Sequence, residues 1–240
     1  MTSTLVLRLA APLQSWGTDS RANRRETRRE PSKSGVIGML AAASGRLRTD
    51  DVSDLAQLKF GTRIDQPGVL QADFQTARDW VTGKNKALSY RDYLMDAVFL
   101  VALEGQEDLI DRCAEALQRP VYPYFLGRRS CPPTRRVVLR TTSDSLEECL
   151  SSEDWLASEH HRRKQPEKVR LSVVRDAAPG ETPDEMVVDT PASFHPTKRV
   201  HDFRAVVRSS VMIENPVAQK KYRGHAFNDD HDPMAFLERR

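Results

Sequence analysis

The feature of this sequence that most limits its fold is an apolar strand followed immediately by an amphipathic helix. The run DAVFLVALEG (Asp96–Gly105) is almost continuously apolar, which is typical of a strand buried on both faces. The next segment, QEDLIDRCAEALQRP, repeats its apolar residues at helical spacing, carries acids in its first turn and ends at Pro120. Together they predict a strand–helix unit in a packed α+β domain.

The same alternation of strands and helices extends through residue 141. A helix is predicted in PSKSGVIGMLAAASG, with Ser32 or Ser34 as its N-cap and Gly45 at its end. The other strands are expected at Thr4–Leu9, Lys59–Asp65 and Arg136–Thr141. The order is therefore β-α-β-β-α-β, which predicts a ferredoxin-like fold of the α+β class.

Two further segments complete the predicted organisation. The stretch at about residues 66–96 is too long for a hairpin turn, and we expect a protruding, partly β insertion there. After Ser143 the pattern weakens to a short helix in SLEECL, a polar loop in EHHRRKQPEK, and strand candidates in KVRLSVVRDA, EMVVDT and FRAVVRSSVMIE. We therefore expect a ferredoxin-like domain at 1–145 and a small antiparallel β module at 146–240, which ends in a flexible acidic tail.

The composition argues against several other classes of protein. No run of about 18 apolar residues exists, so no membrane-spanning helix is predicted. The three cysteines, Cys113, Cys131 and Cys149, are odd in number and form no CxxC pair. They indicate a reduced, cytoplasmic protein without a disulfide framework or zinc site, in which the cysteines serve packing.

Positive charge gathers in two segments that are far apart in the sequence. Between Arg21 and Lys33 six basic residues face only two acids, and between Pro120 and Arg140 there are five arginines and no acid. Acids gather elsewhere, as in TDDVSD and SLEECLSSED. Segregation of this kind is typical of a protein that binds a polyanion, although a solvated surface with chance clustering would also produce it.

Both basic segments contain residues that suit contact with a phosphate backbone. In EPSKSG the first turn of the predicted helix would offer N–H groups to a phosphate, while Lys33, Ser34 and Gly35 add a charge, a hydroxyl and room for close approach. In LGRRSCP, Gly127 would allow close approach and the two following arginines would bind phosphate. Tyr124, just upstream, could stack on an unpaired base or lie in the core.

Three functional classes remain open: an RNA-binding scaffold, a metal-independent endoribonuclease and a protein–protein adaptor. Cleavage of RNA without a metal ion usually needs a histidine, and this chain has none before His160. His160 and His161 lack the i, i+4 spacing of a helical metal site, so no metal and no cofactor are predicted. The scaffold is therefore favoured. A nuclease would have to use a tyrosine and a lysine, chosen from Tyr90, Tyr122, Tyr124, Lys84 and Lys86.

Four stretches, in chain order, resemble one known family: LVLRLAAPLQSWG, PSKSGVIGMLAAASG, YRDYLMDAVFLVAL and YPYFLGRRSCPPT. They are similar to the subtype I-E members of the CRISPR-associated Cas-five family (RAMP superfamily), which are subunits of the surveillance complex Cascade. The likeness covers about residues 4–140, and LGRRSCP is its most specific piece. It implies a ferredoxin-like, RRM-related domain that caps the 5′ handle of CRISPR RNA (crRNA) without cutting it and helps to position guide and target DNA in antiviral defence. In a related subtype the family member processes CRISPR repeat RNA, which keeps the endoribonuclease as the alternative.

The resemblance also implies partners and contact residues. The insertion at 66–96 would be a thumb that lies between guide and target DNA, with contacts from Arg78, Trp80, Tyr90 and Arg91. The chain would touch the Cascade backbone subunit and the large subunit that reads the PAM. Together with the two basic segments, the expected RNA-binding set is Arg24, Arg25, Arg28, Arg29, Lys33, Ser34, Gly35, Tyr124, Gly127, Arg128 and Arg129.

Overall fold

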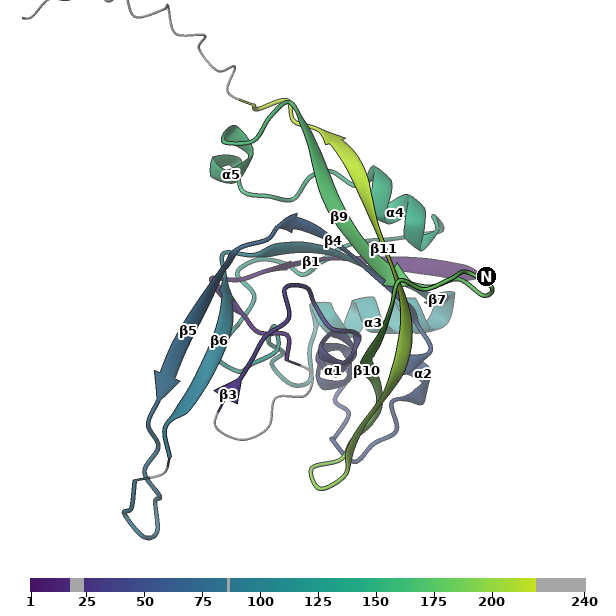
Figure 1. The fold of residues 1–240 in the computed structure, drawn as a ribbon. Coiled ribbons are helices and arrows are strands. Elements are labelled where there is room, and N and C mark those ends of the chain that lie inside the picture. The colour runs from purple at the N-terminus through teal and green to yellow at the C-terminus, as the bar shows by residue number, and fades with distance from the viewer. Residues whose placement is uncertain (18–23, 86, 219–240) are drawn as a thin grey trace, which may run out of the picture.

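The computed structural model describes residues 1–17, 24–85 and 87–218 of the 240-residue chain (Figure 1). In this part of the chain the fold is mixed α+β, with a large sheet in the order β10-β11-β9-β4-β7-β1-β8 and a smaller sheet in the order β2-β6-β3, with β5 beside β6. All neighbours in the large sheet are antiparallel. Its strands are β1 (Thr2–Ala10), β4 (Lys59–Gln66), β7 (Val98–Gln106), β8 (Val138–Thr142), β9 (Lys168–Asp176), β10 (Glu185–Phe194) and β11 (Arg199–Glu214).

The helices cover both faces of the large sheet, with α1 and α3 on one side and α4 on the other (Figure 1). Their bounds are α1 (Lys33–Ala43), α2 (Ser53–Ala56), α3 (Glu107–Gln118), α4 (Leu146–Ser152) and α5 (Glu159–Arg163). Ser32 rather than Ser34 caps α1, because its hydroxyl accepts a hydrogen bond from the N–H of Gly35 at 3.3 Å. In α3 the predicted apolar face is buried, including Ile110 and Leu117.

β1 and β7 lie next to each other inside the large sheet because both strands are apolar on both faces. Leu5 and Leu7 belong to the main core, together with Ile37 of α1. Val6, between them, points the other way and packs with Leu150 of α4. The alternation buries successive side chains in two different clusters, so an uninterrupted apolar run is what this position requires. The strands predicted from the sequence at both places are confirmed.

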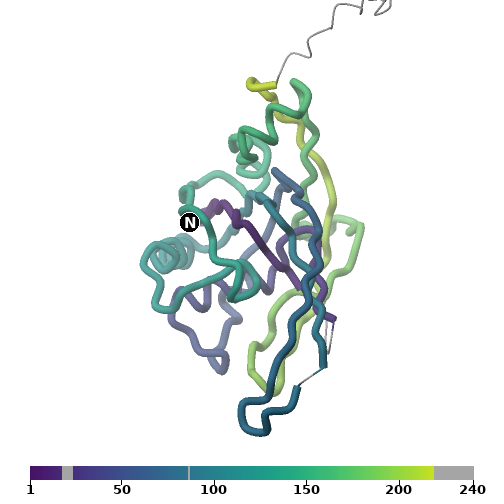
Figure 2. The backbone as a smooth tube through the Cα atoms, turned by 90° about the vertical axis from the view of Figure 1, so that its left-hand side faces the viewer, coloured from purple at the N-terminus to yellow at the C-terminus, as the bar shows by residue number. Residues whose placement is uncertain are grey.

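The predicted insertion is a β-hairpin that extends away from the large sheet (Figures 1 and 2). β5 (Val69–Gln75) and β6 (Ser89–Met95) pair antiparallel along their whole length, with Val69 opposite Met95. β6 also pairs with two short strands, β2 (Leu13–Gln14) and β3 (Arg24–Arg25), within stretches that the sequence did not assign to strands. β2 thereby pairs with β6 at the base of the hairpin, and β3, within the first basic segment, pairs with it farther out, at Tyr90 and Arg91.

The C-terminal strands extend the large sheet, which corrects the expectation of a separate module packed on the first domain. β9 pairs with β4 through Gly61 and Arg175, so β9, β10 and β11 continue the sheet that begins with β1. Their antiparallel arrangement is as predicted. The segment EHHRRKQPEK is not a plain loop, since residues Glu159–Arg163 form α5.

The remaining expectations concern the cysteines, membrane-spanning helices and a few residues outside the described ranges. Cys113, Cys131 and Cys149 are free and buried, in keeping with a packing role. Burial raises the pKa of the Cys113 thiol to about 11. Across the described ranges, no helix is both long enough and apolar enough to cross a bilayer. Arg21, Lys86 and the predicted acidic tail lie outside the described residues, which end at residue 218.

Candidate nucleic-acid interface

The two basic segments meet beside the smaller sheet. β3 pairs in parallel with β6, so that Arg24 lies opposite Tyr90 and Arg25 opposite Arg91. The loop that carries Arg128 reaches the same place from the second basic segment. Arg128 and Arg25, which are 103 positions apart in the sequence, are in direct contact. The fold therefore joins the two segments that the charge pattern singled out.

Arg128 holds this junction together. Its Nη1 donates to the carbonyl oxygen of Asp92 at 3.1 Å and its Nη2 to the carbonyl oxygen of Arg25 at 2.8 Å. Its guanidinium lies 4.7 Å from the centre of the Tyr93 ring, within the range of a cation–π contact. Burial alone would raise the pKa of Tyr93, but contacts with Ser130 and Arg128 lower it below its ordinary value. Two donors of Arg128 are thus in use inside the protein, and no carboxylate neutralises its charge among these contacts. Its contact with phosphate stays a prediction.

Gly127 makes the turn from which Arg128 projects. Its φ of +89° lies in the left-handed region that favours glycine. A Cβ at this position would stand 1.6 Å from the carbonyl oxygen of Ser15. The N–H of Ser15 donates to the carbonyl oxygen of Leu126 at 3.1 Å, which fixes the two backbones side by side. A glycine is therefore required here. It allows close approach by the backbone of Ser15, a part of the same chain.

Arginines of both basic segments are available to an external anion. Arg25, Arg29 and Arg129 are exposed and have no carboxylate partner within residues 1–17, 24–85 and 87–218. Arg24 is also exposed and lies 3.5 Å from Glu26 in a solvent-screened pair of little strength. Within the predicted RNA-binding set, these four arginines therefore carry charges that an external anion can reach.

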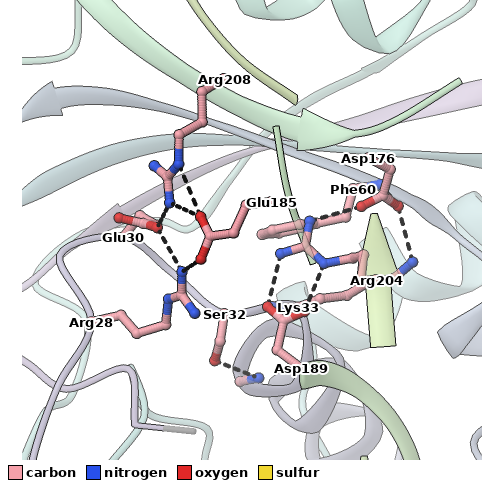
Figure 3. A network of polar contacts seen from close by, with 11 residues as sticks. Arg28, Glu30, Ser32, Lys33, Phe60, Asp176, Glu185, Asp189, Arg204 and Arg208 are labelled. Atoms are coloured by element: carbon pink, nitrogen blue, oxygen red, sulfur yellow. Dashed lines mark hydrogen bonds and ion pairs between the residues drawn. The ribbon is translucent and has the colours of Figure 1, made fainter. Parts of the chain in front are cut away.

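Arg28, in contrast, is held by carboxylates (Figure 3). Its Nη2 lies 3.3 Å from Glu30 and 3.4 Å from Glu185 at the start of β10. Arg208 of β11 binds the same two carboxylates at 2.9 Å. Two arginines and two glutamates therefore form a charge-balanced set. The prediction of an unpaired charge at Arg28 is wrong, because an acid 157 residues away helps to balance it.

Lys33 is buried at the start of α1, and its charge is used inside the protein (Figure 3). Its Nζ lies 3.1 Å from Asp176, and its backbone N–H donates to Asp189 at 2.9 Å. Arg204 joins these carboxylates, at 2.7 Å from Asp189 and 2.8 Å from Asp176. The carboxylate of Asp189 thus occupies the N-terminal end of α1. The expected phosphate contact through Lys33 and the helix start is corrected, since the chain supplies its own anion there.

Ser34, Gly35 and Tyr124 also make internal contacts. Ser34 is buried, and a Cβ on Gly35 would come within 2.8 Å of the Trp16 ring. The hydroxyl of Tyr124 donates to the carbonyl oxygen of Leu117 at 3.1 Å, and burial raises its pKa. All three residues of the predicted set nevertheless line a pocket beside α1.

Acids from the C-terminal strands pair with the basic segments, and for one of them, Asp189, the sequence contains a local signal. In EMVVDT, Val187 and Asp189 are separated by two positions, so they share a face of the strand, and both are buried. A carboxylate at a core-facing position requires a paired cation. For Glu185 and Asp176 no comparable signal exists.

The predicted thumb residues lie at different positions along the β5–β6 hairpin. Trp80 lies near the tip and is 96 % exposed. Arg78 stabilises that tip, because its Nε donates to the carbonyl oxygen of Gly83 at 2.7 Å. Tyr90 and Arg91 lie in β6 beside β3.

The histidines that the sequence offered for metal or catalysis lie in α5. Ser158 caps this short helix by accepting a hydrogen bond from the N–H of His161 at 3.3 Å. His161 packs edge-on against Trp155, and burial lowers its pKa. In the part of the chain that the structure describes, no group of three or more His, Cys, Asp or Glu side chains is placed to hold a metal ion.

The family of the chain follows from a comparison with known proteins. Residues 4–207 match the model of the family described as CRISPR-associated protein (Cas_Cas5). The chain belongs to this Cas5 family. The matched range includes the two basic segments, the β5–β6 hairpin and most of the C-terminal strands, and it confirms the resemblance that the sequence motifs indicated.

Individual relatives of this Cas5-family chain agree with that assignment. It is 35% identical over 168 residues to "CRISPR system Cascade subunit CasD" of Escherichia coli (strain K12), in an alignment that covers 60% of this chain and 74% of that protein. A solved "CRISPR RNA-guided surveillance complex" contains a chain with a TM-score of 0.74 and 30% identity, covering 92% of this chain and 95% of that one. A "Crystal structure of Cas protein" gives a TM-score of 0.68 and 36% identity, covering 90% and 97%.

Proposed function

We propose that this Cas5-family chain is a Cascade subunit that binds the 5′ handle of crRNA without cutting it and helps to position guide and target DNA in antiviral defence. The observation that carries the proposal is the junction of β3 with the 127–131 loop. It brings together Arg24, Arg25 and Arg128, next to the exposed Arg129, with Glu26 as the one carboxylate that pairs with them among the described residues. Such a cluster matches the repeated charge of an RNA backbone.

We propose further that residues 1–145 form a ferredoxin-like unit. Its elements follow in the order β1, α1, β4, β7, α3, β8, with the short α2 before β4. The four strands lie in one antiparallel sheet as β4-β7-β1-β8. The strands after residue 145 would then extend this unit and supply the carboxylates that hold its basic segment.

The β5–β6 hairpin is proposed as a thumb between guide and target DNA, and as a contact for the backbone subunit and the large PAM-reading subunit. Support comes from its apolar side chains, which the described residues of the chain leave uncovered. Trp80, Val81 and Phe74 are exposed by 96%, 88% and 65%. Exposed apolar side chains in one projecting element are typical of a surface that another molecule covers.

The proposed RNA contact is tested by the dependence of affinity on salt. Each lost phosphate contact flattens the plot of log affinity against log salt by about 0.7 for a single strand. Arg25→Gln combined with Arg129→Gln should therefore flatten it by about 1.4 for crRNA, measured by fluorescence anisotropy. The matched control is Arg112→Gln with Arg170→Gln, two exposed arginines outside both basic segments. An unchanged slope in the first pair, or an equal change in the control, would contradict the proposal.

The proposed absence of cleavage is tested by incubating the purified chain with CRISPR repeat RNA in EDTA. The RNA is expected to remain at full length. Tyr124, one candidate of the alternative mechanism, has a raised pKa and donates its hydroxyl to a main-chain carbonyl, so it is poorly suited to take up a proton. A specific product that disappears in Tyr90→Phe or Tyr122→Phe would instead establish the metal-independent endoribonuclease.

A further inference from the structure

A pocket of about 400 Å³ lies beside α1, against the segment that joins β10 to β11. Gly35 and Gly38 of α1 line it together with Phe194 and His195, and Phe194 packs next to Gly38. Its volume is within the range of sites that hold small molecules, about 300–1,000 Å³. Because Gly127 is also among the lining residues, the pocket adjoins the loop that carries the exposed Arg129.

Two arginines give the pocket an unbalanced positive charge. Arg48 and Arg199 both line it, and neither has a carboxylate partner in the ranges that the structure describes. Partial burial, and then the charge of Arg48, lowers the pKa of Arg199. Arg46, another lining residue, is by contrast neutralised by Asp54. Two like charges placed together without a counter-ion repel each other, and an anion bound at both relieves that repulsion.

The remaining wall is aromatic. The rings of Tyr124, Phe125 and Phe194 line the pocket, and the guanidinium of Arg199 lies 5.8 Å from the centre of the Phe194 ring. Aromatic side chains next to cations are how proteins hold unpaired bases and their phosphates together. On the helical side, a Cβ on Gly38 would lie 3.5 Å from the Phe194 ring, so this glycine and the ring form one wall of the pocket.

We propose that this pocket holds one nucleotide of the bound RNA strand, with its phosphate at Arg48 and Arg199 and its base against Phe194 and Tyr124. The inference rests on the proposed RNA-binding function and assigns a subsite to it. It gives a role to Tyr124, which lines the pocket although its hydroxyl is bound internally. It also gives a role to the loop between β10 and β11, for which the sequence offered none.

The first test fills the pocket. A Cβ on Gly38 would meet the Phe194 ring at 3.5 Å, an ordinary contact, so Gly38→Met should be tolerated and its longer side chain should project into the cavity. Methionine also favours a helix interior over glycine, which keeps the fold stable. The full chain should bind a 3′-labelled synthetic RNA with the repeat-derived 5′ handle at least about tenfold more weakly than wild type. Gln118→Met, at an exposed position of α3, is the matched control and should bind normally.

The second test locates the nucleotide. The same RNA is made with single abasic sites at successive positions. One position should weaken binding to wild type, and it should add nothing to the loss already caused by Gly38→Met, because both changes remove the same contact. Arg48→Gln with Arg199→Gln provides an independent variant should Gly38→Met fail to fold, and it should weaken binding without removing it.

The outcomes separate this inference from the function on which it rests. If wild type binds the RNA and the Arg25/Arg129 variant weakens it, but both pocket variants bind like wild type, the pocket inference alone is overturned. The pocket inference would also be overturned if, at every abasic position, the loss of affinity added to the loss caused by Gly38→Met. If wild type does not bind the RNA, the proposed function fails and the pocket inference fails with it.

Discussion

Replacing Asp65 by alanine is expected to lower the free energy of unfolding by about 3–5 kcal/mol. Asp65 and Arg63, both in β4, are fully buried and form a bidentate pair, with Nε–Oδ1 at 2.7 Å and Nη2–Oδ2 at 3.0 Å. Removal of Asp65 leaves the buried guanidinium of Arg63 without a compensating charge. The substitution also removes the acceptor of the Leu156 N–H, which binds Asp65 at 2.6 Å.

Asp65→Ala should also destabilise the end of α4 and the segment that follows it. Arg63 donates to the carbonyl oxygens of Leu150, Glu153 and Asp154, at 3.0, 2.8 and 2.8 Å, and so ties this segment to β4. Urea unfolding followed by circular dichroism measures the loss. Arg163→Gln, which breaks an exposed pair with Glu159 in α5, is the control and should cost less than about 0.5 kcal/mol. Similar losses in Asp65→Ala and Arg163→Gln would show that the buried pair is not essential to the fold.

Gly127→Ala is the other substitution with a large expected effect. The left-handed conformation alone costs an alanine about 1–2 kcal/mol. The new Cβ would in addition meet the carbonyl oxygen of Ser15 at 1.6 Å, so the two backbones must separate and the hydrogen bond from Ser15 to Leu126 must break. We expect a total loss of about 2–5 kcal/mol and weaker crRNA binding, because Arg128 would lose its position against Arg25.

Gly180→Ala separates the two causes of this loss. Gly180 has a φ of +83°, close to the +89° of Gly127, but a Cβ there would meet nothing within 4 Å. It should therefore lose about 1–2 kcal/mol and bind crRNA as wild type does. Thermal unfolding and the crRNA titration measure both effects for each variant. Equal stabilities of the two alanine variants would mean that the contact with Ser15 is readily relieved.

The backbone elements of the first 141 residues could be predicted because their patterns are local. The apolar run of β7 and the helical face of α3 each report which sides of a segment are buried, and that information lies within about ten neighbouring residues. β3 could not be predicted in this way. Arg24 and Arg25 are exposed and charged, and they become a strand only because β6 offers them its unpaired edge.

The candidate site could be predicted in part. The sequence identified both basic segments and the glycine turn, since clusters of arginine and a lone glycine are visible without a fold. It misjudged Arg28 and Lys33 because their partners, Glu185 and Asp176, are 157 and 143 residues away. It also missed the pocket at Arg48 and Arg199, because these two residues are far apart in the sequence.

The sequence by itself determined most of the strands and helices in the first part of the chain, the segments where positive charge is concentrated, and the family to which the chain belongs. Only the tertiary structure decided which of those charges remain available. β9 pairs with β4 and brings Asp176 to Lys33, while β10 brings Asp189 to the start of α1 and Glu185 to Arg28. Ion pairs form through space at a few ångströms, so their partners depend on strand pairing rather than on distance along the chain.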